Sequence, residues 1–178
     1  MDLREKKTKR SIHNSFIELR SRKELEKITV KELCERAEIS KATFYLHYRD
    51  IYDLSESLQH EVVQDIVRGI TDPEELVYNY RTANRKLIES FYAHRGMIDI
   101  LFSGSQFSHL TESLEAGIKE LIFGRFPELR DDVYANVMMT YQLMGVFYSF
   151  YRYEKTFGYE KVMESVERIR EFFIDKDR

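Results

Sequence analysis

Hydrophobic residues recur along most of the chain at the three- and four-residue intervals that are typical of amphipathic helices. A two-residue alternation, which is typical of half-buried strands, does not persist in any segment. Only two prolines and seven glycines interrupt the pattern. The sequence therefore predicts an all-α fold, and the predicted helices are residues 2–22, 30–37, 41–47, 51–69, 73–94, 97–102, 107–124, 133–153 and 159–174.

Residues 28–58 carry the most specific signal. Thr29 precedes an apolar-periodic segment and Glu32 follows three residues later, which is the capping-box spacing at the start of a helix. Ser40 can cap a second helix over residues 41–47 after a break of about three residues. Because two short helices joined so tightly must cross steeply, the segment predicts helix-turn-helix geometry.

The second of these helices has an unusual surface. No carboxylate occurs between Glu38 and Asp50. If Phe44 and Tyr48 turn toward the body of the protein, four side chains are left to face outward: Lys41, Thr43, Tyr45 and His47. A surface without carboxylates suits an approach to phosphates.

The order of residues 39–48, ISKATFYLHY, resembles the turn and recognition helix of TetR-family transcription regulators, and the resemblance covers roughly residues 6–58. It implies a groove-facing set of Lys41, Ala42, Thr43, Tyr45 and His47, and places Ser40 and Tyr48 near backbone phosphates. Thr29 and Lys9 complete the predicted DNA-binding residues.

Two positions depart from the family pattern. Glu38 occupies the turn position that usually holds Gly, and a left-handed conformation there costs a non-Gly residue on the order of 1 kcal/mol. Ile51 replaces the usual Lys at the start of the next helix, and an isoleucine side chain cannot supply the phosphate contact of that Lys. Arg49 is the alternative source of that contact.

The formal net charge is −3, but it is unevenly distributed. Residues 1–50 contain 13 Lys/Arg and 9 Asp/Glu, a balance of +4, whereas the remaining residues contain 15 and 22, a balance of −7. Only the first part is therefore a plausible partner for a polyanion. Its basic start, with Lys6, Lys7, Lys9 and Arg10, is either a solvated helix end or a phosphate-contacting arm beside the recognition helix.

The segment 133–153 is hydrophobic around most of its circumference and includes Gly145, which permits close approach of another helix. With residues 159–174 it can form half of a four-helix bundle shared by two protomers. An ordinary internal hairpin is the alternative. The family resemblance also implies a homodimer made by the last two long helices.

Most of the 12 Tyr and 12 Phe residues follow residue 77. Aromatic residues at helical spacing are usually core, but a cavity lined by Tyr hydroxyls also suits an apolar or amphipathic small molecule. The candidate ligand-binding residues are Tyr80, Tyr92, Phe107, Tyr141 and Tyr148.

The sequence contains no motif for catalysis. The five histidines show no metal-ligand spacing, no phosphate-binding Gly loop occurs, and the single Cys34 falls on a core stripe. We therefore predict no catalytic residue, no metal and no cofactor. The single cysteine and the absence of an 18-residue apolar run predict a cytoplasmic protein without a membrane partner.

Together these features predict a helix-turn-helix DNA-binding domain at residues 5–55 and a helical regulatory and dimerisation domain at residues 56–178. We expect the protein to be a ligand-responsive transcriptional regulator. Repression is the most common mode in this family, and an unknown small-molecule effector would release the repressor from a palindromic double-stranded DNA operator. Effector binding would move the helix at residues 53–69 and change the distance between the recognition helices. The alternative is a coactivator or adaptor of the same fold that acts through a protein partner.

Overall fold

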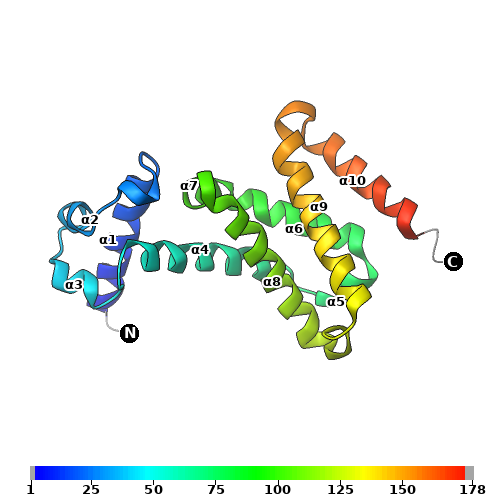
Figure 1. Cartoon of the computed structure of the whole chain (residues 1–178), viewed down its shortest axis with the longest axis horizontal. Coiled ribbons are helices and arrows are strands. Elements are labelled where there is room, and N and C mark those ends of the chain that lie inside the picture. The colour runs from blue at the N-terminus through cyan, green and yellow to red at the C-terminus, as the bar shows by residue number, and fades with distance from the viewer. Residues whose placement is uncertain (1–2, 175–178) are drawn as a thin grey trace. The chain divides into compact units, whose positions relative to one another are not determined.

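The computed structural model describes residues 3–174, apart from the side chains of Tyr80, Arg81, Ser105 and residues 170–174. Throughout these residues the fold is all-α, as the hydrophobic pattern predicts (Figure 1). The helices are α1 (Leu3–Arg20), α2 (Val30–Ala37), α3 (Lys41–Tyr45), α4 (Ile51–Arg68), α5 (Pro73–Tyr78), α6 (Tyr80–Ala93), α7 (Arg95–Leu101), α8 (Phe107–Arg125), α9 (Val133–Phe157) and α10 (Tyr159–Ile174), with short 3₁₀ turns η1 (Leu25–Lys27), η2 (Gly104–Gln106) and η3 (Pro127–Leu129).

The chain divides into two compact units. The first contains Met1–Asp65 and Ala93–Leu110, and the second contains Ile66–Tyr92 and Thr111–Arg178. The helices α4 and α8 each contribute residues to both units. Residues 5–55, the predicted DNA-binding domain, all fall in the first unit. The sequence pattern gave no indication that the segment from Ala93 to Leu110 also belongs there.

The core of the first unit forms where α1 packs on α2 and α7, and α2 packs on α3. Ile12 and Phe16 of α1, Leu33 of α2 and Phe44 of α3 are fully buried. Burial of each such side chain stabilises the folded state by about 1.5–3 kcal/mol. These contacts hold the short helix α3 in place, although five residues are too few to form a stable helix in isolation.

Helix α1 ends at Arg20, earlier than predicted, and residues 21–27 do not extend it. The reason is the buried guanidinium of Arg20, which donates hydrogen bonds to the carbonyls of Lys23 (2.9 Å) and Ser103 (3.3 Å). Both carbonyls belong to residues outside α1, and the carbonyls at the end of the helix accept from the backbone N–H groups of Ser21, Arg22 and Lys23 instead. Arg20 therefore folds the chain back into the turn that leads to η1.

The prediction of one helix over residues 73–94 is wrong, because Asn79 separates α5 from α6 with φ −131° and ψ 60°. Its N–H donates to Glu75 O at 2.9 Å and ends α5, whereas its own carbonyl accepts from Ala83 N–H at 3.1 Å and begins α6. Asn favours such positions because its side chain can hydrogen-bond to nearby backbone groups in non-helical conformations. The predicted start of α5 is confirmed, since Asp72 Oδ1 accepts from Glu74 N–H.

In the second unit α10 packs on α9. The buried side of α9 carries Leu143, Val146, Phe147 and Phe150. The helix continues four residues beyond its predicted end and stops at Gly158, which has φ +84°. Of the helices within the described residues, none is sufficiently long and apolar to cross a membrane.

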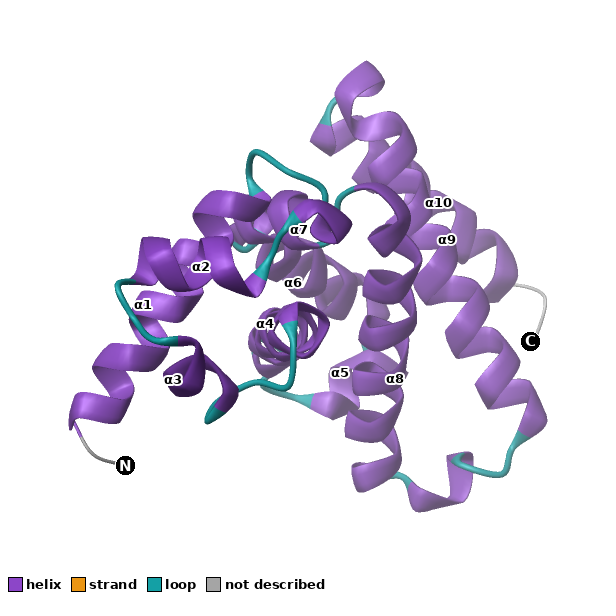
Figure 2. Cartoon of the chain, turned by 60° about the vertical axis from the view of Figure 1, so that its left-hand side comes forward, coloured by secondary structure: helices purple, strands orange, loops and turns teal. Residues whose placement is uncertain are grey.

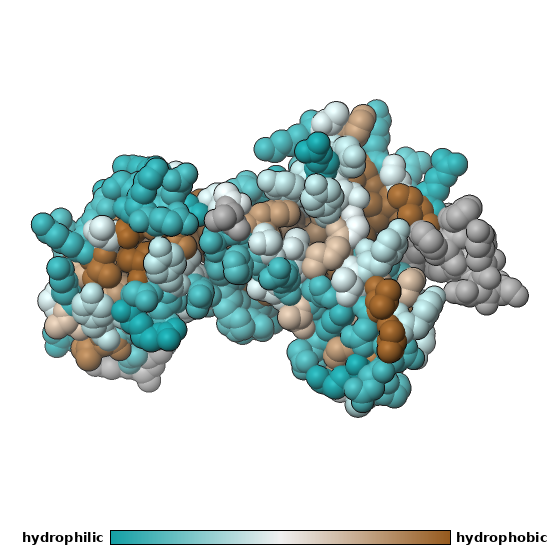
Figure 3. Space-filling view, in the orientation of Figure 1, coloured by the Kyte–Doolittle hydropathy of each residue, from teal (hydrophilic) through white to brown (hydrophobic). Residues whose placement is uncertain are grey.

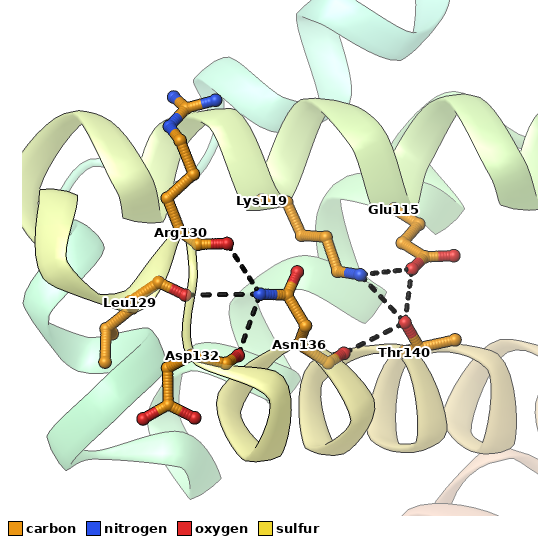
Figure 4. A network of polar contacts seen from close by, with 7 residues as sticks. All are labelled: Glu115, Lys119, Leu129, Arg130, Asp132, Asn136 and Thr140. Carbon is orange, nitrogen blue, oxygen red and sulfur yellow. Dashed lines mark hydrogen bonds and ion pairs between the residues drawn. The ribbon is translucent and has the colours of Figure 1, made fainter.

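A polar cluster fixes α9 against α8 (Figure 4). Lys119 Nζ pairs with Glu115 at 2.7 Å and donates to Thr140 Oγ1 at 2.8 Å. The amide group of Asn136 points at three carbonyls of the preceding connection, those of Leu129, Arg130 and Asp132. Because these groups satisfy one another at the edge of the core, they specify the register of the two helices.

Candidate nucleic-acid interface

The start of α2 is capped as the sequence predicts. Thr29 has extended backbone geometry, and its Oγ1 accepts a hydrogen bond from Glu32 N–H at 3.2 Å. The side chain of Glu32 does not complete the reciprocal bond of a capping box; it pairs with Lys23 Nζ at 2.6 Å instead. Thr29 itself is exposed at the N-terminus of α2, where backbone N–H groups favour anions.

The turn between α2 and α3 keeps the left-handed conformation expected of a glycine. Glu38 has φ 55° and ψ 42°, and is the one non-Gly residue with positive φ among those described. Its N–H and that of Ile39 close the end of α2 through bonds to Glu35 O and Cys34 O. The turn geometry is therefore retained at a steric cost to Glu38.

Glu38→Gly is expected to raise the free energy of unfolding by about 1 kcal/mol, because glycine adopts this conformation without a clash between Cβ and the carbonyl. Urea denaturation followed by circular dichroism measures the change. The control Glu35→Gly, inside α2, is expected to lower stability by about 1 kcal/mol. A loss of stability in Glu38→Gly would show that the turn is not strained.

Helix α3 begins at Ser40, whose Oγ accepts from Thr43 N–H at 3.0 Å and lies 2.9 Å from Thr43 Oγ1. The predicted cap is thus confirmed. The helix ends at Tyr45 rather than at residue 47, and Leu46 and His47 continue as a turn. The regular helix is therefore two residues shorter than predicted, and Leu46 and His47 follow it directly.

The side chains of this segment divide sharply between core and solvent. Phe44 and Tyr48 are buried, as predicted, whereas Lys41, Ala42 and Tyr45 are exposed. Tyr45 is 56% exposed, although its ring still meets the edge of Phe44 with centroids 5.5 Å apart. Thr43 and His47 are half-buried. The structure therefore brings the five residues predicted to face the groove onto one short, capped segment.

Leu46 is a residue that the sequence reasoning did not assign to this surface. It is 82% exposed, an unusual position for a large apolar side chain. A signal was present, because Leu46 lies two residues after Phe44 and two before Tyr48, and both of those face the core. An exposed apolar side chain beside Tyr45 can contact a thymine methyl group or the sugar edge of a groove.

Tyr48 is buried and contacts α1. Its hydroxyl shares a 2.6 Å hydrogen bond with Nε2 of His13 on α1. Burial raises the pKa of the Tyr48 hydroxyl and lowers the pKa of the His13 imidazole. The negative charge of Glu61 raises the pKa of His13, whereas the positive charge of Lys9 lowers it further. Tyr48 therefore positions α3 against α1, and its contact with a phosphate stays a prediction.

The first unit is expected to lose stability as the pH falls below about 6.5, the ordinary pKa of histidine. The folded pKa of His13 lies below that value, so the unfolded chain binds the proton more readily and acid favours unfolding. The melting temperature should therefore fall more steeply between about pH 7.5 and about pH 5 for the parent than for His13→Gln. Parallel curves for the two proteins would contradict this role of His13.

A basic groove runs along α1. Its volume is about 500 Å³, and its lining comprises Lys6, Lys9, Arg10, His13, Asn14, Ile17, Leu58, Glu61 and Met97. Lys9 is half-buried in this lining and Arg10 is exposed. The positive side chains lie on the helix that bears His13, the partner of Tyr48. The basic start of the chain thus belongs to the same unit as α3.

The residues that follow α3 explain one departure from the family pattern. Ile51 is buried in the core, and a lysine side chain could not occupy the same apolar position without burying its charge. Arg49, the alternative phosphate contact, is exposed but forms a two-nitrogen pair with Asp53 Oδ1 at 2.8 and 3.1 Å. A phosphate would have to compete with that carboxylate for the guanidinium.

The predicted ligand-binding residues differ in their exposure. Tyr141 and Tyr148 are exposed on α9, whereas Tyr92 is half-buried with its ring 5.3 Å from that of Tyr159. Phe107 is half-buried at the start of α8. The side chain of Tyr80 lies outside the described residues. These assignments stay predictions.

Within the described part of the chain, no three His, Cys, Asp or Glu side chains lie together in a way that could hold a metal ion. Cys34 is a buried free cysteine, and burial raises the pKa of its thiol. A protonated thiol in a core is unreactive. The residue therefore serves packing between α2 and its neighbours.

Comparison of the chain with protein-family models gives no match, and comparison with curated proteins gives none either. The functional argument therefore depends on the geometry of α2, α3 and their surroundings.

Proposed function

We propose that the protein is a ligand-responsive, DNA-binding transcription regulator of the TetR type, with repression of a palindromic operator as its main mode. The observation that supports this proposal best is the surface of α3. A five-residue helix, capped by Ser40 and anchored by Phe44, presents exposed side chains in a stretch of eleven residues that contains no carboxylate. Such a surface can approach a polyanion without electrostatic repulsion.

The proposed base contacts come from the exposed side of this segment. Tyr45 and Thr43 contact base edges or a thymine methyl group, and Lys41 reaches a guanine or a phosphate. Ala42 allows close approach of the helix to the groove floor, and His47 contacts the backbone. Ser40, Thr29 and Lys9 are the proposed phosphate contacts, since the first two lie at helix N-termini and the third belongs to the basic groove.

A second copy of the chain is the proposed partner of α9. Val137 is 61% exposed, and Tyr134, Tyr141 and Tyr148 are exposed at the same helical spacing. Gly145 lies on this face with open space above its Cα, which lets another helix approach closely. Hydrophobic atoms are visible at the surface over α9 and α10 (Figure 3). Since a helix that is apolar on nearly all sides needs cover on all sides, a homodimer accounts for this face.

Binding to DNA tests the proposal directly. Fluorescence anisotropy with labelled genomic fragments, measured at two salt concentrations, should show sequence-selective binding that weakens as salt rises, because phosphate contacts release counterions. Absence of selective binding at low salt would defeat the proposal. The same result would favour an adaptor that acts through a protein partner, a function suggested by the buried Ile51 and by the Arg49–Asp53 pair.

A further inference from the structure

Leu46 lies on the side of the α3 segment that faces directly away from the core. Successive residues of a helix are rotated by about 100°, so Leu46 is rotated by about 200° from Phe44. The backbone of Leu46 keeps helical geometry, with φ −71° and ψ −20°, and its N–H donates to Ala42 O at 3.2 Å. Phe44 is fully buried and Leu46 is 82% exposed, so the burial of both side chains agrees with this rotation.

The centre of this outward face is apolar. Ala42 lies one turn before Leu46, at the i and i+4 spacing of a single helical face, and both side chains are exposed. Tyr45 is rotated by only about 100° from Phe44, and its ring still contacts the Phe44 ring. The polar side chains of the segment flank this apolar centre: Lys41, Thr43 and His47.

The outward face is held in one orientation by contacts on both sides of Leu46. Figure 2 shows α3 as a short helix with a loop at each end, and Ser40 caps its start. After Leu46, the N–H of Tyr48 donates to Phe44 O at 3.0 Å, and the Tyr48 hydroxyl contacts Nε2 of His13. Leu46 therefore lies between two buried aromatic residues. A side chain presented by a pre-formed backbone loses little conformational entropy on binding.

An apolar centre with polar flanks matches the major groove of DNA. On the groove floor, the 5-methyl group of thymine is an apolar feature that distinguishes thymine from cytosine. Phosphates and sugars lie at the groove edges, where the flanking polar side chains would meet them. Two apolar side chains are too few for a stable protein interface, which buries about 800 Å² on each partner. The composition of the face therefore favours a base edge as its occupant.

We infer that Leu46 recognises a thymine methyl group in each half-site of the DNA that the protein binds. This inference rests on the proposed function and goes beyond it, because Leu46 is not among the proposed base and phosphate contacts. Contact between the leucine side chain and the methyl group removes apolar surface of both from water. Loss of one such methyl group should weaken binding about fourfold, which corresponds to about 0.8 kcal/mol.

Replacement of thymine by deoxyuridine tests the inference, because deoxyuridine lacks only the methyl group and keeps the same base pairing. The probe is the DNA sequence that the purified full-length protein enriches from a random pool, with its thymines replaced one at a time. Fluorescence anisotropy measures the Kd for each probe. At one or more thymines of a half-site, the replacement should raise the Kd of the parent about fourfold.

A variant of Leu46 assigns this thymine preference to the side chain. Leu46→Ala should melt at the parent temperature, because truncation of an exposed side chain removes little packing. It should bind the thymine probe about fourfold more weakly than the parent and bind thymine and deoxyuridine equally at one position. The matched control Leu3→Ala makes the same change at an 85% exposed leucine of α1, and should keep the thymine preference.

Two results would overturn the inference and leave the proposed function in place. One is selective DNA binding in which no thymine replacement affects the parent. The other is a thymine preference in Leu46→Ala that equals that of the parent at every position. Failure of the parent to enrich any DNA sequence would instead defeat both the proposed function and the role of Leu46.

Discussion

Tyr45→Ala is expected to weaken binding to the preferred DNA sequence by about 1–3 kcal/mol, or about 5- to 150-fold in Kd, without unfolding the protein. Tyr45 is exposed, so truncation removes a contact to the groove and little packing. The free energy of unfolding should stay within about 0.5 kcal/mol of the parent. Lys41→Ala should also weaken binding, but more uniformly across DNA sequences and with a smaller salt dependence if the ammonium contacts a phosphate.

The adjacent residue provides the contrast. Phe44→Ala should lower the free energy of unfolding by about 3–5 kcal/mol, because the side chain of Phe44 is fully buried in the core of the first unit. Tyr78→Ala is the matched control for Tyr45→Ala, since it removes an exposed tyrosine from α5 in the second unit. Anisotropy titrations and urea denaturation of all variants separate the two effects. Parent-like DNA affinity in Tyr45→Ala would remove Tyr45 from the proposed interface.

Val137→Glu is expected to convert the proposed homodimer into a monomer. The two-fold symmetry of a homodimer repeats each substitution, so two carboxylates would be placed within an apolar contact. An unpaired charge in such a contact costs several kcal/mol, and the dimer Kd should rise roughly 100-fold or more. Sedimentation velocity at several protein concentrations measures this change.

The control for this experiment is Leu3→Glu, which makes the same change at an exposed apolar position of α1. It should leave the oligomeric state unchanged. The monomeric Val137→Glu should also bind a palindromic operator weakly, because each copy meets a single half-site. A parent protein that sediments as a monomer, or a Val137→Glu variant that remains dimeric, would contradict the assignment of the α9 face.

Much of the first unit could be predicted because its signals are local. The cap at Thr29, the cap at Ser40 and the bounds of α2 follow from residue types at fixed spacing, and all three are observed. The burial of Phe44 and Tyr48 also follows from the helical period. Such features depend on neighbours within one or two turns, which the sequence displays directly.

The features that could not be predicted depend on contacts between distant residues. The hydrogen bond from His13 to Tyr48 spans 35 positions, and the bond from Arg20 to Ser103 spans 83. The break at Asn79 was missed because the apolar spacing continues through it, and only the backbone geometry shows that α5 ends there.

Selection of DNA fragments from a random pool by the purified protein is the decisive test of whether α3 recognises DNA. We expect enrichment of one sequence with two-fold symmetry, whose half-sites are separated by about one helical turn or a similar spacing. Tyr45→Ala, used in the same selection, should lose that enrichment while remaining folded. A pool that shows no enriched sequence, or the same enrichment with the parent and with Tyr45→Ala, would contradict the account.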